Sequence, residues 1–236
     1  MNDMRSQDMG SRILRSAWGL DPPTTRGPKA RSSVDDIVAA AMSLADADGL
    51  TVVSLAAVAA ELGLTTTALY RYIDSKDTLV EIMVDAAVGP APQLGEGDWR
   101  ARALAWAQQL WNRYRTHPWL ADVRAAGMPR YPQRLAWIDL LLRELDRGSV
   151  PDPMHTALLL DGLAHTFALL TGPANRPAAP PAWLLEAAAA RYPRLAQELD
   201  RDWTDIEEEF IKAVTTVLRG AEPMSDGGCP GDAKGA

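Results

Sequence analysis

The sequence is poor in the residues that most often build catalytic and metal sites. It has one cysteine, Cys229, and only three histidines, His117, His155 and His165. A single cysteine excludes an intramolecular disulfide and a cysteine metal cluster, and the histidines do not follow the short spacings typical of metal ligands. No Gly-rich phosphate loop follows a strand pattern. We therefore expect no catalytic site, no metal and no cofactor.

Long hydrophobic runs are also missing. No stretch approaches the roughly 20 apolar residues that a membrane span needs, and residues 1–15 lack the apolar segment of a secretory signal. Hydrophobic residues nevertheless make up 47% of the chain and charged residues 23%, a usual balance for a protein with a packed core. We expect a globular protein of the cytoplasm that makes no contact with a membrane.

Strand patterns are absent, and from Ser33 onward apolar residues recur at helical spacing. Proline and glycine clusters divide the chain. The sequence predicts an all-α fold with a disordered basic arm at 1–31, a first domain at 32–90, a larger helical domain at 98–220 and a disordered tail at 221–236. Five or six longer helices are expected in the larger domain, roughly at 98–117, 130–147, 153–171, 181–200 and 203–219.

The first domain shows a series of helix start and stop signals. Ser33 and Asp36 match a capping box, and Gly49 follows the first helical run. Ser54 can then cap a short helix that Gly63 ends. A second short helix, capped by Thr65 or Thr66, is expected to run through Ile73, and Asp74-Ser75 caps a third. A helix, a glycine-centred turn and a short helix make a helix-turn-helix arrangement.

Specific motifs fill this domain. They are Ala41-x-x-Leu44-Ala45, Asp48-Gly49-Leu50, Ser54-Leu55-x-x-Val58-Ala59-x-Glu61-Leu62-Gly63-Leu64, Ala68-Leu69-Tyr70-Arg71-Tyr72-Ile73 and Ser75-Lys76-x-x-Leu79. Together they resemble the DNA-binding domain of the TetR family of transcriptional regulators. The resemblance implies an N-terminal three-helix helix-turn-helix domain, followed by a C-terminal helical domain for ligand binding and dimerisation.

The second short helix, from about Thr65 to Ile73, is the candidate reading helix, which would lie in the major groove of DNA. It begins with small hydroxyl side chains, which can reach phosphates or base edges. Tyrosine hydroxyls and one arginine follow, and the resemblance implies a phosphate contact at Lys76. One of the threonines can instead be an ordinary helix cap, and Tyr70 can instead pack in the core. The candidate DNA-binding residues are Thr65, Thr66, Thr67, Tyr70, Arg71, Tyr72, Lys76, Ser54, Arg31 and Lys29.

The charge of this domain has the wrong sign for a DNA-binding protein. Residues 32–77 contain seven acidic residues against two cations, Arg71 and Lys76, and the whole chain has a net charge of −7. Arg26, Lys29 and Arg31 immediately precede the first helix. We hypothesise that this arm lies along the phosphates or enters the minor groove; the alternative is a merely solubilising segment.

The larger domain is rich in aromatic residues, since seven of the eight tryptophans lie beyond residue 98. Such a set can line an apolar pocket that binds a small molecule, although it can equally form a tryptophan-rich core. Asp161 and His165, four residues apart, can face the ligand or satisfy each other within one turn. The candidate ligand-binding residues are Trp106, Leu110, Tyr114, His117, Trp137, Leu141, Asp161 and His165.

The segment 153–171 is apolar nearly all round, so its helix needs partners on two sides. The resemblance implies that this helix and the helix at 203–219 form a four-helix bundle across the axis of a homodimer. The sequence thus predicts a homodimeric repressor that binds double-stranded operator DNA and is released by a small, largely apolar effector. The alternative is a helical small-molecule binding protein with weak or lost DNA affinity.

Overall fold

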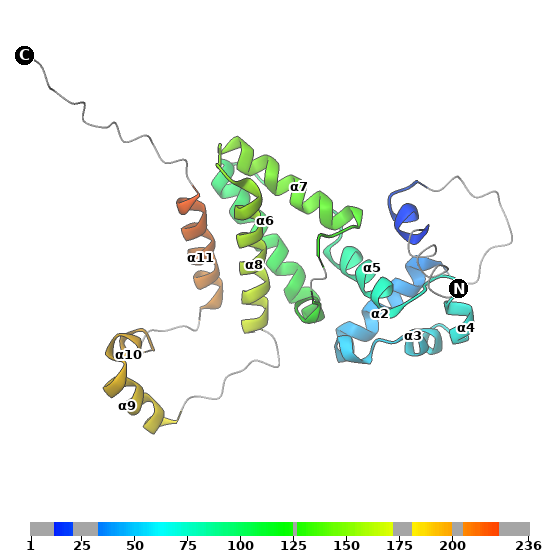
Figure 1. Cartoon of the computed structure of the whole chain (residues 1–236), viewed down its shortest axis with the longest axis horizontal. Coiled ribbons are helices and arrows are strands. Elements are labelled where there is room, and N and C mark those ends of the chain that lie inside the picture. Colours follow the sequence, from blue (N-terminus) through cyan, green and yellow to red (C-terminus); the bar gives the residue numbers. More distant parts are fainter. Residues whose placement is uncertain (1–11, 21–32, 125–126, 172–180, 200–204, 222–236) are drawn as a thin grey trace, which may run out of the picture.

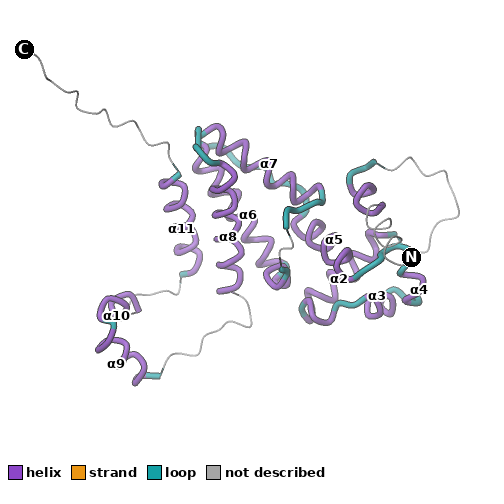
Figure 2. Tube along the Cα trace, viewed as in Figure 1, coloured by secondary structure: helices purple, strands orange, loops and turns teal. Residues whose placement is uncertain are grey.

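The computed structural model describes residues 12–20, 33–124, 127–171, 181–199 and 205–221. Within these ranges every regular element is a helix, and Figure 2 shows the helices joined by loops without a strand in the part that is coloured. The predicted all-α class is confirmed. Among the described residues, none of the helices has the length and hydrophobicity of a membrane span.

Four helices form a bundle at one end of the molecule (Figure 1). They are α2 (Val34–Asp48), α3 (Leu55–Glu61), α4 (Thr66–Leu69) and α5 (Lys76–Val88), with the short 3-10 helix η1 (Leu50–Val52) between α2 and α3. Their apolar faces meet in one core, in which Ile37, Val58, Leu69, Leu79 and Met83 are fully buried.

Each helix of this bundle begins at a hydroxyl side chain. Ser33 and Asp36 form the predicted capping box at the start of α2, and Ser54, Thr65 and Ser75 cap α3, α4 and α5. Gly63 makes the turn between α3 and α4 at φ +63°, a conformation that glycine adopts without strain. The predicted caps and the predicted turn are confirmed.

The reading helix α4 is shorter than the sequence predicts, because it ends at Leu69 and not at Ile73. Beyond Leu69 the N–H groups of Arg71 and Tyr72 bond to carbonyls three residues back, which tightens the last turn. The tighter turn lets Ile73 reach the core before the chain enters the Ser75 cap.

The N-terminal segment also differs from the prediction. Residues 12–17 form a helix where we expect a disordered arm, since Ile13 is buried in the core of the bundle. The indole N–H of Trp18 donates to the carbonyl of Arg130 at 3.0 Å. Two large apolar side chains within a polar stretch are enough to dock it. The other parts of the predicted arm and tail (1–11, 21–32 and 222–236) lie outside the described residues.

The second half of the molecule is built around α6 (Trp99–Thr116). Helices α7 (Pro132–Arg147), α8 (Pro153–Thr171) and α11 (Ile206–Gly220) all pack against it, and the 3-10 helix η2 (Pro118–Asp122) follows it. The predicted helices at 98–117, 130–147 and 153–171 are confirmed to within two residues at each end. The helix predicted at 203–219 begins at Ile206 with Asp205 as its cap.

The helix predicted at 181–200 is two helices, α9 (Ala182–Arg191) and α10 (Pro193–Leu199). Pro193 has no N–H to continue the helix and restricts the residue before it, so Tyr192 leaves helical geometry at φ −136° and ψ 67°. The two helices pack on each other and stand apart from the rest of the molecule in Figure 1. Several of their large apolar side chains are exposed, namely Trp183, Leu184, Leu185, Tyr192 and Leu195.

Candidate nucleic-acid interface and ligand cavity

The helix α4 presents polar side chains on a firm apolar base. Leu69 and Ile73 are fully buried beneath it, whereas Thr67, Tyr70 and Arg71 are exposed. Tyr70 is 49% exposed, which argues against the alternative of core packing. Thr67 lies on α4 and Tyr70 and Arg71 in the tight turn after it, so the three exposed side chains share one short, well-supported segment, as base readout in a major groove requires.

The remaining residues of the predicted interface have mixed positions. Thr65 is exposed but its hydroxyl accepts from the N–H of Ala68 at 3.2 Å, so this threonine is the helix cap. Thr66 and Tyr72 are half-buried, and Tyr72 packs against the core of the bundle.

Ser54 and Lys76 lie at the starts of the neighbouring helices. Ser54 caps α3 through the N–H of Ala57, and Lys76 is exposed in the first turn of α5. Both can flank a duplex that contacts α4. The arm residues Arg26, Lys29 and Arg31 lie outside the described residues.

Two of the acidic side chains near this surface are engaged within the protein. Asp36 takes part in the capping box, and its hydrogen bonds from Ser33 lower the pKa of its carboxyl. Asp46 accepts hydrogen bonds from the other half of the molecule, from His117 Nδ1 at 2.8 Å and from Trp119 Nε1 at 2.7 Å. Asp48, Glu61 and Asp77 are exposed, so the acidic character of the domain persists.

A cavity of about 430 Å³ opens among α6, η2, α8 and α11. Its lining is of mixed character, with aromatic and apolar side chains beside the ionisable groups of Tyr114, Arg115 and Glu207. The lining residues are Trp111, Tyr114, Arg115, Pro118, Ala168, Thr171, Ile206 and Glu207. Of the predicted ligand-binding residues, only Tyr114 is among them.

Four of the predicted ligand-binding residues belong to the packed core. Trp106, Leu110, Trp137 and Leu141 are at most 1% exposed. The Trp106 and Trp137 rings meet edge to face at 5.9 Å, and the Trp106 indole N–H donates to the Trp137 carbonyl at 2.8 Å. The structure therefore favours the alternative that these residues are a tryptophan-rich core.

Asp161 and His165 do not bond to each other. Asp161 forms an ion pair with Arg134 of α7, and His165 Nε2 lies 3.0 Å from the Ala121 carbonyl. Their common neighbour is Tyr114, whose ring lies 5.8 Å from that of His165. Burial, reinforced by the Asp161 charge, raises the pKa of Tyr114 to about 12, so its phenol stays protonated.

His117 lies outside the cavity and joins the two halves of the molecule instead. It ends α6, and its imidazole meets Asp46 near the end of α2. Trp119, whose contact with Asp46 the sequence does not predict, is 2% exposed and donates to the same carboxylate oxygen. The His-Pro-Trp segment after a long helix was the available signal, but its partner is more than 70 residues away.

A second connection between the halves is made by Asp85 of α5, which is only 7% exposed. Its carboxylate accepts the backbone N–H groups of Gln133 (3.3 Å) and Arg134 (2.8 Å), at the start of α7. Tyr131, the residue before α7, gives no side-chain cap, so Asp85 caps this helix from another domain. Burial outweighs these bonds and raises the pKa of Asp85.

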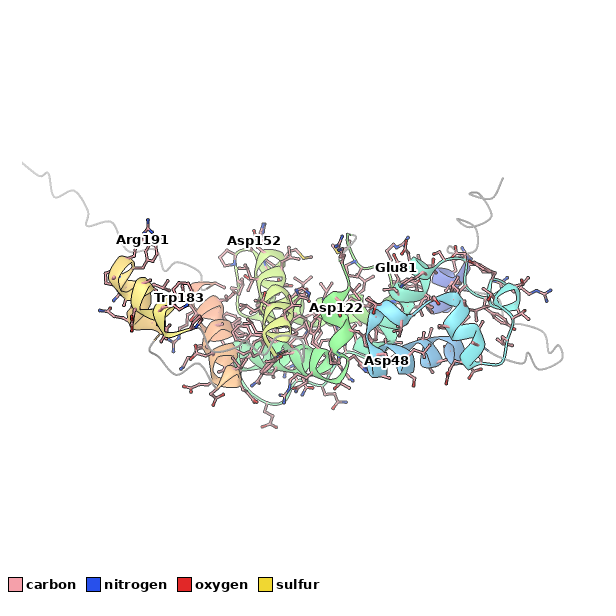
Figure 3. The ribbon with its side chains drawn as sticks, turned by 90° about the horizontal axis from the view of Figure 1, so that it is seen from below. Asp48, Glu81, Asp122, Asp152, Trp183 and Arg191 are labelled. Carbon is pink, nitrogen blue, oxygen red and sulfur yellow. The ribbon has the colours of Figure 1, made fainter. Side chains whose placement is uncertain are left out.

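A third connection is the ion pair between Glu81 of α5 and Arg130, which precedes α7. Figure 3 shows Glu81 where the two halves meet, with Trp183 and Arg191 at the far end on α9. The helices α6 and α7 belong to the cavity-bearing half, and both also contact α5 of the other bundle. No group of three or more His, Cys, Asp or Glu side chains able to hold a metal ion occurs in the described ranges.

Comparisons with known proteins agree with this geometry. Residues 37–83 match the model of bacterial regulatory proteins of the tetR family, and residues 91–224 match that of the tetracyclin repressor-like C-terminal domain. The HTH-type transcriptional repressor DrrR1 of Streptomyces coeruleorubidus is 34% identical over 157 residues, 64% of this chain and 58% of DrrR1. An HTH-type transcriptional regulator of Saccharopolyspora erythraea is 31% identical over 104 residues, 43% of this chain and 44% of the relative. The matched part therefore spans about half the length of these relatives.

Solved structures show the same fold. The TetR family protein ActR of Streptomyces coelicolor, in complex with (S)-DNPA, aligns with a TM-score of 0.68 at 21% identity, covering 81% of this chain and 98% of ActR. ActR in complex with actinorhodin aligns with a TM-score of 0.67 at 19% identity, covering 83% and 97%. The two family models together span both halves of the molecule, and the chain belongs to the TetR family.

Proposed function

We propose that this protein is a homodimeric transcriptional repressor that a small molecule releases from its operator. The observation that carries the proposal is the exposure of Thr67 on α4 and of Tyr70 and Arg71 in the turn after it. They stand on a buried base, in a domain joined to the half that bears the cavity. The names of the curated relatives, a transcriptional repressor and a transcriptional regulator, support this assignment. Such a protein acts in the cytoplasm, where the operator DNA is.

Each subunit inserts α4 into a major groove. Thr67 and Tyr70 offer hydroxyl groups to base edges and phosphates, and Arg71 offers a cation. Lys76 and Ser54 bind phosphates on either side. Arg26, Lys29 and Arg31 supply further positive charge along the backbone, which offsets the acidic residues of the domain.

The homodimer forms through α8 and α11. Leucine side chains that the single chain leaves exposed line one side of α8, at 38–62% exposure, and need a partner. These are Leu158, Leu159, Leu169 and Leu170. A two-fold axis through this face sets the two reading helices about one turn of DNA (roughly 34 Å) apart.

The effector occupies the cavity among α6, η2, α8 and α11. ActR, which shares the fold, has been crystallised with (S)-DNPA and with actinorhodin, which supports a small-molecule site in this half. The effector releases DNA only if it binds the DNA-free conformation more tightly than the DNA-bound one. The connections at Asp46 and Asp85 give the route by which movement of α6 and α7 reorients the reading helix.

A mobility-shift titration with the promoter DNA that flanks the gene tests the proposal. We expect a specific, salt-sensitive shift with the full chain and a loss of at least about tenfold in affinity for Arg71→Ala. Arg143→Ala is the matched control, because Arg143 is an exposed arginine of α7 paired with Asp139. No specific shift under any salt condition would favour the alternative of a small-molecule binding protein without DNA affinity.

A further inference from the structure

The cavity has an aromatic wall that belongs to a larger stack. Trp111 packs edge to face on Phe167 at 6.5 Å and lies 4.6 Å from Phe210 at a tilt of 31°. Pro118, Ala168 and Ile206 complete the apolar part of the lining. Trp111 itself is 3% exposed, so only a small part of its ring borders the cavity. A flat apolar molecule gains mainly by covering the apolar lining beside it.

One ion pair spans the cavity between two helices. Arg115 of α6 and Glu207 of α11 lie 3.8 Å apart, and their side chains are 53% and 62% exposed. An ion pair with this exposure stabilises little, so a ligand can replace either partner at low cost.

The two partners are not equivalent. Arg115 places its guanidinium carbon 5.3 Å from the centre of the Trp111 ring, which keeps the cation beside the wall without Glu207. Glu207 lies in the first turn of α11, where the helix dipole stabilises a carboxylate that has lost its partner. Exchange of Glu207 for another anion is therefore easier than exchange of Arg115 for another cation.

The polar groups next to the wall are mainly hydrogen-bond donors. The indole N–H of Trp111 is buried and has no acceptor among the described residues. The phenol of Tyr114 is protonated because burial raises its pKa to about 12. A buried donor without an acceptor is unfavourable, so a ligand gains a hydrogen bond if one of its acceptor oxygens comes within reach of either group.

We propose that the effector is an aromatic anion such as a carboxylate, whose ring packs on the apolar lining beside Trp111 and whose charge replaces Glu207 on Arg115. The inference rests on the proposed function and names the chemical class of its ligand. Arg115 precedes His117 by two residues, so the exchange occurs beside the contact between α6 and Asp46. It also removes an ion pair between α6 and α11, one of the two helices of the proposed dimer face.

Three probes with one ring system test the ligand class by calorimetry on the full chain: 2-naphthoate, neutral 2-naphthamide and cationic (2-naphthyl)methylamine. We expect 2-naphthoate to bind about three- to tenfold more tightly than either of the others. Arg115→Met should lower the affinity for 2-naphthoate to that for 2-naphthamide, and Glu207→Gln should raise the affinity for 2-naphthoate. Arg143→Met, on an exposed ion pair outside the cavity, is the matched control and should change nothing.

Tightest binding of the amine, or unchanged binding of 2-naphthoate to a folded Arg115→Met variant, would overturn the inference. If operator DNA is shifted but no probe binds, the ligand class and the cavity assignment fail while DNA binding stands. If the probes bind in the expected order but no DNA is shifted, the proposed function fails and the ligand class stands.

Discussion

The two halves of the molecule differ in how one helix of the larger half, α7, is capped. In α2–α5 every helix starts at its own Ser or Thr cap, a contact between residues three positions apart. In the larger half α7 has no side-chain cap of its own and uses Asp85 of another domain, about 48 residues away. The helices α6 and α11 also start at local caps, Asp98 and Asp205. The difference therefore lies in α7, whose cap comes from α5 and joins the two halves.

The largest loss of stability is expected for a substitution in the core of the half that bears the cavity. Trp106→Ala should reduce the free energy of unfolding by about 4 kcal/mol, because it removes a fully buried indole and its hydrogen bond to Trp137. Urea unfolding followed by circular dichroism measures it, with Trp183→Ala, 66% exposed, as a control expected within about 0.5 kcal/mol. A much smaller loss of stability for Trp106→Ala would indicate that Trp106 borders a ligand site, as the sequence predicts, and is not part of the packed core.

A smaller loss of stability is expected when an ion pair between α6 and α7 is broken. Glu144 is 1% exposed and binds Arg102 of α6 at 2.7 and 2.9 Å, so Glu144→Gln should cost about 2–3 kcal/mol. The hydrogen bond from Arg102 lowers the pKa of Glu144 below its ordinary value of 4.5. The stabilisation that this ion pair gives is therefore complete above the ordinary pKa of 4.5, and it is lost as the pH falls through the pKa of Glu144 in the folded protein.

Unfolding measured from pH 7 to pH 3 checks the sign. The wild-type protein should lose more stability than Glu144→Gln over this range. Asp139→Asn, which removes an exposed i,i+4 pair with Arg143, is the control and should show little difference from the wild type. Parallel pH profiles for Glu144→Gln and the wild type would be inconsistent with the assigned pair.

The smallest effect is expected for a local cap in the reading domain. Ser54→Ala removes the bond to the N–H of Ala57 and should cost about 1 kcal/mol in thermal or urea unfolding. Ser43→Ala, at an exposed position inside α2, should be neutral or slightly stabilising. Equal effects of the two substitutions would show that the caps do not determine the stability of this domain.

This difference between the halves explains what the sequence could predict. Ser33, Ser54, Ser75 and Gly63 are local signals, and the helices that they bound were identified from residues a few positions apart. Pro193 is an equally local signal, which the predicted helix at 181–200 does not take into account.

The ligand cavity could not be identified in this way. Trp106 and Trp111 lie five residues apart on α6, but only Trp111 lines the cavity, and this depends on where α8 and α11 pack. For the same reason the roles of His117, Trp119 and Asp85 were not accessible, since each bonds to a residue of the other domain. Sequence pattern predicts which face of a helix is apolar, and not which buried side chain borders an empty space.

The central claim is that contacts between the two halves link the cavity to the reading helix. The most direct test measures operator affinity with and without a saturating amount of the tightest-binding naphthalene probe, in the wild type and in Asp46→Ala. Asp48→Ala, exposed two residues further along α2, is the matched control. We expect the probe to weaken operator binding about tenfold in the wild type and in Asp48→Ala. In Asp46→Ala, which loses the bonds to His117 and Trp119, the factor should fall below about threefold. An undiminished factor in a folded Asp46→Ala protein would contradict the account.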